Sequence, residues 1–97
     1  MYAIAIIRYR KPFEEVQKVL EDHRVYLRGL KERRLLLASG PLEPRHGGAL
    51  LLRVPDEAVH QTLEAIRDHD PYVQQGVAQY ELLPWNPGIG REDLDKL

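Results

Sequence analysis

Two residues far apart in the sequence, His23 and Asp70, are the best candidates for chemistry. His23 interrupts an apolar stripe whose members recur every three or four residues, so its side chain is expected to face the interior rather than water. A histidine at such a position is either a core residue with locally satisfied ring nitrogens or a general base. Asp70 is either its partner or simply the N-cap of a helix that starts at Pro71, and the two roles are compatible.

A histidine paired with a carboxylate has a defined chemistry. If Asp70 accepts a hydrogen bond from one ring nitrogen of His23, the tautomer is fixed and the other nitrogen faces a pocket as a proton acceptor. That arrangement supports proton abstraction, elimination or isomerisation, and contributes roughly 10²–10⁴-fold in rate. If the pair forms, His23 and Asp70 are candidates for general acid–base proton transfer.

Five further residues are predicted to bind a substrate. Ser39 and Gly40, at the end of a predicted strand, are placed to orient a substrate oxygen, and no Gly-x-Ser-x-Gly motif favours Ser39 as a nucleophile. Arg8 and Arg24 are candidate anion clamps, against the alternative that both are solvated. Tyr72 either lines a pocket for an aromatic ligand or packs at a subunit seam.

No metal and no cofactor are expected. The chain has no cysteine, which excludes disulfides, thiolate metal sites and a cysteine nucleophile. Histidines 46, 60 and 69 do not stand three or four residues apart on a helix, as a helical metal site requires. They are interpreted as scattered surface residues.

The elements that must position these side chains follow from the hydrophobic periodicity. Strands are predicted at residues 2–9, 35–39, 49–54 and 77–83, and helices at about 13–33 and 55–69, with Asp56 as N-cap of the second helix. The order βαββαβ predicts an α+β fold in which two helices cover one face of a four-stranded antiparallel sheet. The 97 residues suffice for a single domain, and residues 85–97 form a tail that packs on a partner subunit or frays.

The strands are apolar on both faces, as in Tyr2-Ala3-Ile4-Ala5-Ile6-Ile7 and Ala49-Leu50-Leu51-Leu52. Two helices cover only one face, and a sheet with one wet face alternates between apolar and polar residues. The open face therefore needs a cover, and a second copy about a two-fold axis is the simplest one. The sequence predicts a homodimer through the open face of the sheet.

Composition excludes several partners. Fourteen basic against fifteen acidic residues give a formal net charge of -1, which lacks the basic surface of a nucleic-acid-binding protein. No apolar run approaches the roughly 20 residues that span a bilayer, and the N-terminus lacks the features of a signal peptide. We expect a cytoplasmic protein that binds neither nucleic acid nor membranes.

Several segments resemble the YCII-related (YciI-like) family. They are His23 with Tyr26-Leu27, Leu35-Leu36-Leu37-Ala38-Ser39-Gly40-Pro41-Leu42, Gly47-Gly48-Ala49-Leu50-Leu51, Asp70-Pro71-Tyr72-Val73-Gln74-Gln75-Gly76-Val77 and Pro84-Trp85-Asn86. The resemblance implies a ferredoxin-like fold paired into a dimeric α+β barrel, with a histidine–aspartate dyad that maps onto His23 and Asp70. Similar folds in the wider barrel superfamily serve as lyases, isomerases and cofactor-free oxygenases on small molecules.

Two functions are therefore compared. The first is a small-molecule enzyme, of lyase or isomerase type, that transfers protons through a His-Asp dyad. The alternative is a non-catalytic dimer that binds a small ligand or regulates another process, with the dyad only anchoring a carboxylate or phenol. A pH–rate profile separates them, because only the enzyme shows turnover that depends on a histidine-like ionisation.

Overall fold

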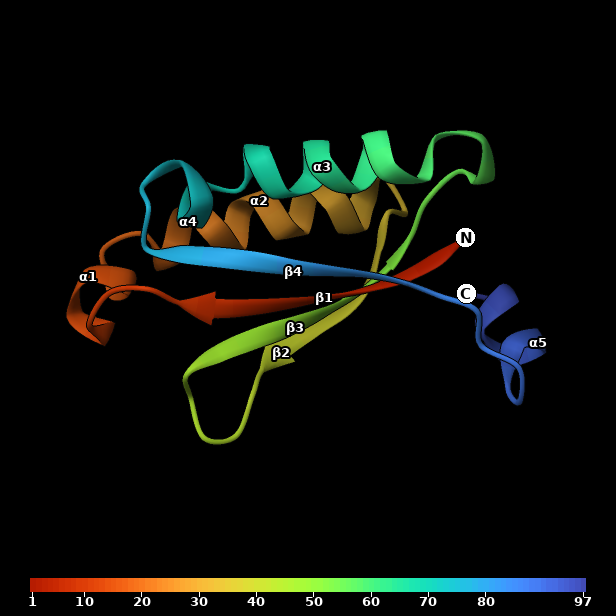
Figure 1. Ribbon diagram of the computed structural model, residues 1–97, viewed down its shortest axis with the longest axis horizontal. Helices are drawn as coiled ribbons and strands as arrows, with labels where there is room; N and C mark the ends of the chain where they lie inside the picture. The colour runs from red at the N-terminus through yellow and green to blue at the C-terminus, as the bar shows by residue number, and fades with distance from the viewer.

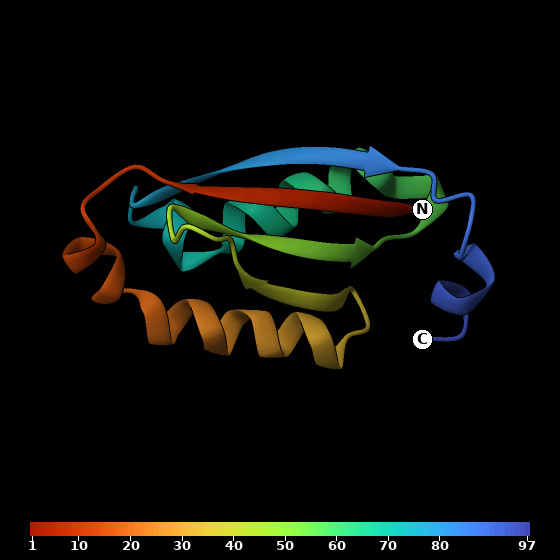
Figure 2. The ribbon, with the colours of Figure 1, turned by 90° about the horizontal axis from the view of Figure 1, so that it is seen from below.

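The computed structural model describes all residues, 1–97. Its elements are β1 (Tyr2–Tyr9), α1 (Phe13–Gln17), α2 (Leu20–Glu32), β2 (Leu36–Pro41), β3 (Gly47–Arg53), a 3₁₀ turn η1 (Asp56–Ala58), α3 (Val59–His69), α4 (Pro71–Gln74), β4 (Ala78–Trp85) and α5 (Arg91–Asp95). The strands form one antiparallel sheet in the order β2-β3-β1-β4, which Figure 2 shows side by side. Helices α2 and α3 lie on one face of it (Figure 1). The predicted ferredoxin-like α+β fold is confirmed.

The core lies between this sheet and the two long helices. Along β1, Ala3, Ala5 and Ile7 face the helices and are 0–2% exposed. They pack against buried residues of the neighbouring elements, among them Leu30, Leu50, Leu52, Leu63 and Ile66. The Tyr26 hydroxyl of α2 donates to the carbonyl oxygen of Ile66 in α3 at 2.8 Å, so one polar contact joins the two helices.

The first predicted helix is interrupted. Instead of one helix over about 13–33, the chain forms α1 and α2, separated by Lys18 and Val19. The Val19 amide donates to the carbonyl of Val16 at 3.0 Å, a tighter closure than that of an α-helix, and the His23 amide resumes α-helical bonding to Val19. α2 therefore starts close before His23 and carries it on its first turn.

Two strands are longer than predicted and contain prolines near their ends. β2 continues to Pro41 and β4 continues through Pro84 to Trp85. Both are edge strands in the observed order, and a proline is tolerated there because the missing amide is not needed by a neighbouring strand. The prediction that these strands end before their prolines was therefore wrong.

Asp56 does not cap the second long helix. It lies in η1, and α3 starts at Val59 without a side-chain cap. The carboxylate of Asp56 instead pairs with the amino group of Met1, which also donates to the carbonyl of Val54 at 3.0 Å. The hydrogen bond and charge of this amino group lower the pKa of Asp56.

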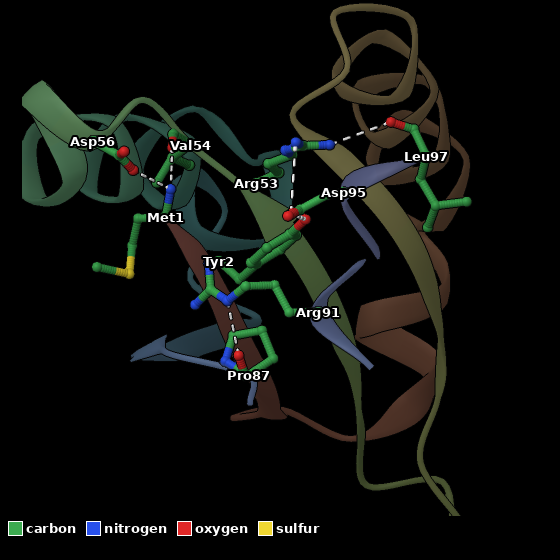
Figure 3. A network of polar contacts seen from close by, with 9 residues as sticks. All are labelled: Met1, Tyr2, Arg53, Val54, Asp56, Pro87, Arg91, Asp95 and Leu97. Atoms are coloured by element: carbon green, nitrogen blue, oxygen red, sulfur yellow. Dashed lines mark hydrogen bonds and ion pairs between the residues drawn. The ribbon is translucent and has the colours of Figure 1, made fainter. Parts of the chain in front are cut away.

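The C-terminal tail packs on its own chain (Figure 3). The Tyr2 hydroxyl donates to Asp95 Oδ1 at 2.6 Å, and Arg53 donates to the carbonyl of Leu97 at 3.2 Å. The guanidinium carbons of Arg53 and Arg91 lie 5.4 and 5.8 Å from the Tyr2 ring centre. These contacts bury Tyr2 and cover one end of the sheet face that the long helices leave open.

The rest of that open face stays apolar. Ile4 pairs with Leu51 on one side and Leu83 on the other, so the three side chains form a row across β3, β1 and β4. Ile4 and Leu51 are half-buried, while Leu83 and the nearby Trp85 are 41% and 38% exposed. None of the helices has the length and apolar character needed to cross a membrane.

Candidate active site

The structure brings His23 and Asp70 together. His23 shares a cleft with residues of α1, α4 and the β2–β3 connection, and these three segments gather at one end of the sheet (Figure 1). His23 comes from the first turn of α2, and Asp70 from the junction between α3 and α4. Nδ1 of His23 lies 2.8 Å from Oδ1 of Asp70, and the two residues are 7% and 0% exposed. A contact between residues 47 positions apart is thus buried beneath the helix layer.

Asp70 has both roles that the sequence analysis considered. Its Oδ1 also accepts a hydrogen bond from the amide of Tyr72 at 2.9 Å, so it is the N-cap of α4, with Pro71 as the first helical residue. Its Oδ2 accepts a hydrogen bond from the Tyr80 hydroxyl of β4. Three donors therefore hold the carboxylate in one orientation without any exposure to solvent.

The imidazole of His23 is held equally firmly. Its ring stacks on the Tyr72 ring with a centroid distance of 3.8 Å and an angle of 3° between the planes. Nδ1 is engaged with Asp70, and Nε2 has no hydrogen-bond partner in the chain. Since no buried side-chain nitrogen or oxygen lacks a partner, Nε2 must reach solvent. With Nδ1–H donated to the carboxylate, Nε2 carries a lone pair that is free to accept a proton.

Nε2 has a place to meet a ligand, because His23 lines a cleft of about 370 Å³. Ser39, Gly40, Arg24 and Tyr72 line the same cleft, so four of the five residues predicted to bind a substrate lie around the His23 ring. A volume of this size falls within the range of about 300–1,000 Å³ that is usual for small-molecule sites. The cleft is thus large enough for a single-ring compound.

Arg8 is the predicted binding residue that the structure places elsewhere. Ile7 and Tyr9, its neighbours on β1, line the cleft, so Arg8 points to the opposite face of the sheet. There its guanidinium lies 3.0 Å from the carboxylate of Glu81, and both side chains are largely exposed. Arg8 therefore contributes nothing to this cleft.

The buried phenols near the carboxylate stay protonated at neutral pH. Burial and then the charge of Asp70 raise the pKa of Tyr26 to about 12. Burial first, and the Asp70 charge and hydrogen bond next, raise the pKa of Tyr80 well above its ordinary value, and burial does the same for Tyr72. Tyr80 therefore acts as a hydrogen-bond donor to Asp70 throughout the physiological range.

Sequence reasoning missed Tyr80 and Arg45. The register puts Tyr80 opposite Ile7, on the helix side of the sheet, where an inward tyrosine needs a polar partner; that need was the available signal. Arg45 lies in the connection between β2 and β3 and also lines the cleft. Its position depends on the loop conformation, which no residue pattern indicates.

The remaining histidines do not assemble into a site. His46, His60 and His69 are all exposed and lie in the β2–β3 connection and at the two ends of α3. Nowhere in the chain do three histidine or carboxylate side chains come close enough together to ligate a metal. His23 is therefore the only one of the four histidines that is buried.

Comparisons with known proteins concern the fold and the family. The fold is similar to that of 5-chloro-2-hydroxyhydroquinone dehydrochlorinase from Burkholderia phenoliruptrix, solved in complex with 2,5-dihydroxybenzoquinone, with a TM-score of 0.70 and 19% identity over 91% of this chain and 96% of that one. At this identity the likeness concerns the fold. No curated protein matches the sequence. The model of the YCII-related domain matches residues 1–86, which include the whole sheet, both long helices, His23 and Asp70. The chain belongs to the YCII-related domain family.

Proposed function

We propose that this protein is a small-molecule enzyme of lyase or isomerase type, in which His23 and Asp70 transfer a proton. The observation that carries the proposal is the buried pair, in which one ring nitrogen is fixed by a carboxylate and the other reaches a cleft. A core histidine needs partners for its polar atoms, but it does not need a ligand-sized cleft at its free nitrogen. The combination is typical of a general base.

The reaction would begin when Nε2 of His23 removes a proton from the bound compound. Asp70 stabilises the imidazolium that forms and keeps the ring in place, because its own three hydrogen bonds prevent it from turning away. Returning the proton at another atom completes an isomerisation, and expelling a leaving group completes an elimination. The dehydrochlorinase with a similar fold bears a name that denotes an elimination, which supports the lyase type.

Ser39, Gly40, Arg24 and Tyr72 are the residues that we propose to bind this compound. They come from β2, α2 and α4, so they surround the His23 ring from three elements. The Ser39 hydroxyl and the Gly40 backbone offer hydrogen bonds, Arg24 offers a charge, and Tyr72 already stacks on the imidazole. Together they provide the few polar groups in a mostly apolar cleft that a small-molecule site needs.

The active form in this proposal is a homodimer that pairs through the open face of the sheet. The apolar row of Ile4, Leu51 and Leu83, with the nearby Trp85, supports this pairing, since a contiguous apolar surface on a strand face is unusual for a monomer. The cleft lies on the helix side, so pairing leaves it accessible.

The test is turnover by the wild type and by His23→Ala. Small hydroxylated and chlorinated aromatic compounds are incubated with the protein, and proton exchange from solvent deuterium and product formation are followed by NMR. We expect His23→Ala to lower the rate by roughly 10²–10⁴-fold.

His60→Ala is the matched control, because His60 is an exposed histidine on α3 outside the cleft. It should keep the full rate. Turnover that survives in His23→Ala, or that falls equally in His60→Ala, would contradict the assignment of the base. If the protein binds these compounds but turns none of them over, the result would contradict the enzyme and favour the non-catalytic ligand-binding dimer.

A further inference from the structure

The charge in the cleft is one-sided. Its lining includes Arg24 and Arg45 but no aspartate or glutamate. The nearest carboxylate described above, that of Asp70, is 0% exposed, and three hydrogen bonds already occupy its oxygens. A ligand in the cleft therefore meets positive charge and no accessible negative charge.

Neither of these guanidinium groups has a partner in the chain. Arg24 and Arg45 form no ion pair and no side-chain hydrogen bond, whereas Arg8 pairs with Glu81, Arg53 with Asp95 and Arg67 with Asp68. Arg33 and Arg34, which follow α2, are unpaired as well, but they do not line the cleft. Arg24 comes from α2 and Arg45 from the β2–β3 connection, so two independent elements bring unpaired cations to the same hollow. Guanidinium groups bind carboxylates through paired hydrogen bonds.

The apolar part of the cleft suits a flat ring. Tyr9, Phe13 and Tyr72 line it. The Tyr9 ring lies 6.2 Å from that of Phe13 and meets Tyr72 edge-on at 6.1 Å and 89°. Phe13 is 43% exposed, which leaves much of this apolar ring open to a ligand. Aromatic side chains at these spacings favour another ring in stacked or edge-on contact.

Positive charge also continues along the helix away from the cleft. Arg24, Arg28 and Lys31 lie at intervals of four and three residues on α2 and line a second hollow of about 310 Å³ beside β2. The two hollows share Arg24 and Ser39. Arg28 pairs with Glu21 at 3.5 Å, so Arg24 and Lys31 are the unpaired cations of this row. Unpaired positive charge beside a cleft raises the local concentration of ligands of the opposite sign.

We infer that the cleft selects small aromatic anions, that is, single-ring compounds carrying a carboxylate or an ionised hydroxyl, with the anionic group at Arg24 and Arg45 and the ring against Tyr9 and Phe13. The inference deepens the proposed function by naming the substrate class of the same site, and it rests on that proposal only for the claim that the bound compound reacts. The ring then lies beside Nε2 of His23, where a proton can be removed.

The experiment is an NMR titration of the ¹⁵N-labelled protein with benzoate, with benzamide as its neutral isostere, and with inorganic phosphate. Benzoate should shift the amide resonances of cleft residues such as Gly47 and Tyr72 and bind at least about tenfold more tightly than benzamide, because hydrogen bonds to charged groups are the stronger ones. Equal affinity for benzoate and benzamide would overturn the role of charge. Phosphate binding as tight as that of benzoate would overturn the role of the ring.

Variants assign the charge to residues. Arg24→Gln and Arg45→Gln should each weaken benzoate binding by about tenfold and leave benzamide binding unchanged. Arg67→Gln is the matched control, since Arg67 is a cation on α3 that pairs with Asp68 outside the cleft. A loss in Arg67→Gln equal to that in Arg24→Gln would show a general effect of net charge and overturn the inference.

The two proposals fail in different ways. If benzoate binds as expected but no compound is turned over, the proposed enzyme fails and the anion site stands. If neutral compounds are turned over with dependence on His23 while Arg24→Gln and Arg45→Gln change no affinity and no KM, the enzyme stands and the anion site fails.

Discussion

The hydroxyl of Tyr80 is the only donor to Oδ2 of Asp70, so its removal is a sensitive test of the site's construction. In Tyr80→Phe, one oxygen of a carboxylate with 0% exposure loses its hydrogen bond. Hydrogen bonds to charged groups contribute about 1.5–3 kcal/mol, and a domain of this size changes its Tm by about 4–8 °C per kcal/mol. We expect the free energy of unfolding at pH 7 to fall by that amount and Tm to fall by at least about 6 °C.

The difference in unfolding free energy between wild type and Tyr80→Phe should become smaller at high pH. The pKa of Tyr80 in the folded state is raised above its ordinary value of 10.0, so the folded state retains a proton that the unfolded state releases. Stability from this group is complete below pH 10 and is lost as the pH rises further, at about 1.4 kcal/mol per pH unit. Tyr80→Phe lacks this loss, and its deficit relative to wild type should shrink by about 1 kcal/mol between pH 10 and pH 11, because the unfolded tyrosine is only half ionised at pH 10.

Urea unfolding followed by far-UV circular dichroism at pH 7, 10 and 11 measures both effects. Tyr26→Phe is the matched control, because the same atom is removed but its partner is the neutral carbonyl of Ile66, for which a cost of about 0.5–1.5 kcal/mol is usual. If Tyr80→Phe costs no more than Tyr26→Phe at pH 7, or if its deficit is independent of pH, the reasoning about the buried carboxylate is refuted.

Three further outcomes are expected. Gly47→Ala should destabilise the fold by about 3 kcal/mol or more in urea unfolding, because the added Cβ would lie 1.7 Å from the carbonyl oxygen of Ile7. Gly40→Ala is the control: its Cβ would meet nothing within 4 Å, so its free energy of unfolding should stay within about 0.5 kcal/mol of wild type. Equal costs for the two variants would contradict the observed register. Leu51→Asp should give a folded monomer in analytical ultracentrifugation, because it puts a charge on the face proposed to pair, and a dimer that persists would count against that interface. Asp70→Asn should lower the proton-transfer rate by roughly 10²-fold or more, because the amide has a single acceptor oxygen and a donor NH₂ in place of the second carboxylate oxygen. An unchanged rate would show that the carboxylate does not orient the base.

The dyad was predictable because helical periodicity is a strong signal. His23 stands in an apolar stripe, and the stripe of the second helix, continued from Leu63 and Ile66, reaches Asp70. The assignment of the two residues as a dyad came from the resemblance to the YCII-related family. The same periodicity did not show the interruption at Val19, since the apolar residues on either side keep their helical intervals across it. β4 continues through Pro84 because it is an edge strand, where a proline is tolerated. The residues of a strand do not show whether it lies at the edge or in the middle of a sheet, so this extension could not be predicted.

The side of the sheet on which a residue lies was the harder question. β1 is apolar at both odd and even positions, so its pattern does not tell which set faces the helices. The choice between an anion clamp and a solvated residue therefore stayed open for Arg8, which lies on the face opposite the cleft. Tyr80 was overlooked for a related reason. The need of its inward hydroxyl for a polar partner was a signal in the sequence, but only the register identifies that partner as Asp70.

The two sides of the cleft differ in how tightly they are tied to the dyad. On one side, Asp70 caps the helix that carries Tyr72, and Tyr72 stacks on His23, so these three side chains shift only as a unit. On the other side, Arg45 belongs to a short surface connection that has no hydrogen bond to any of them. Exchanging residues 42–46 for loops of other composition is therefore a practical route for protein engineering: the choice of ligand can be redesigned while the proton-transfer apparatus is inherited unchanged.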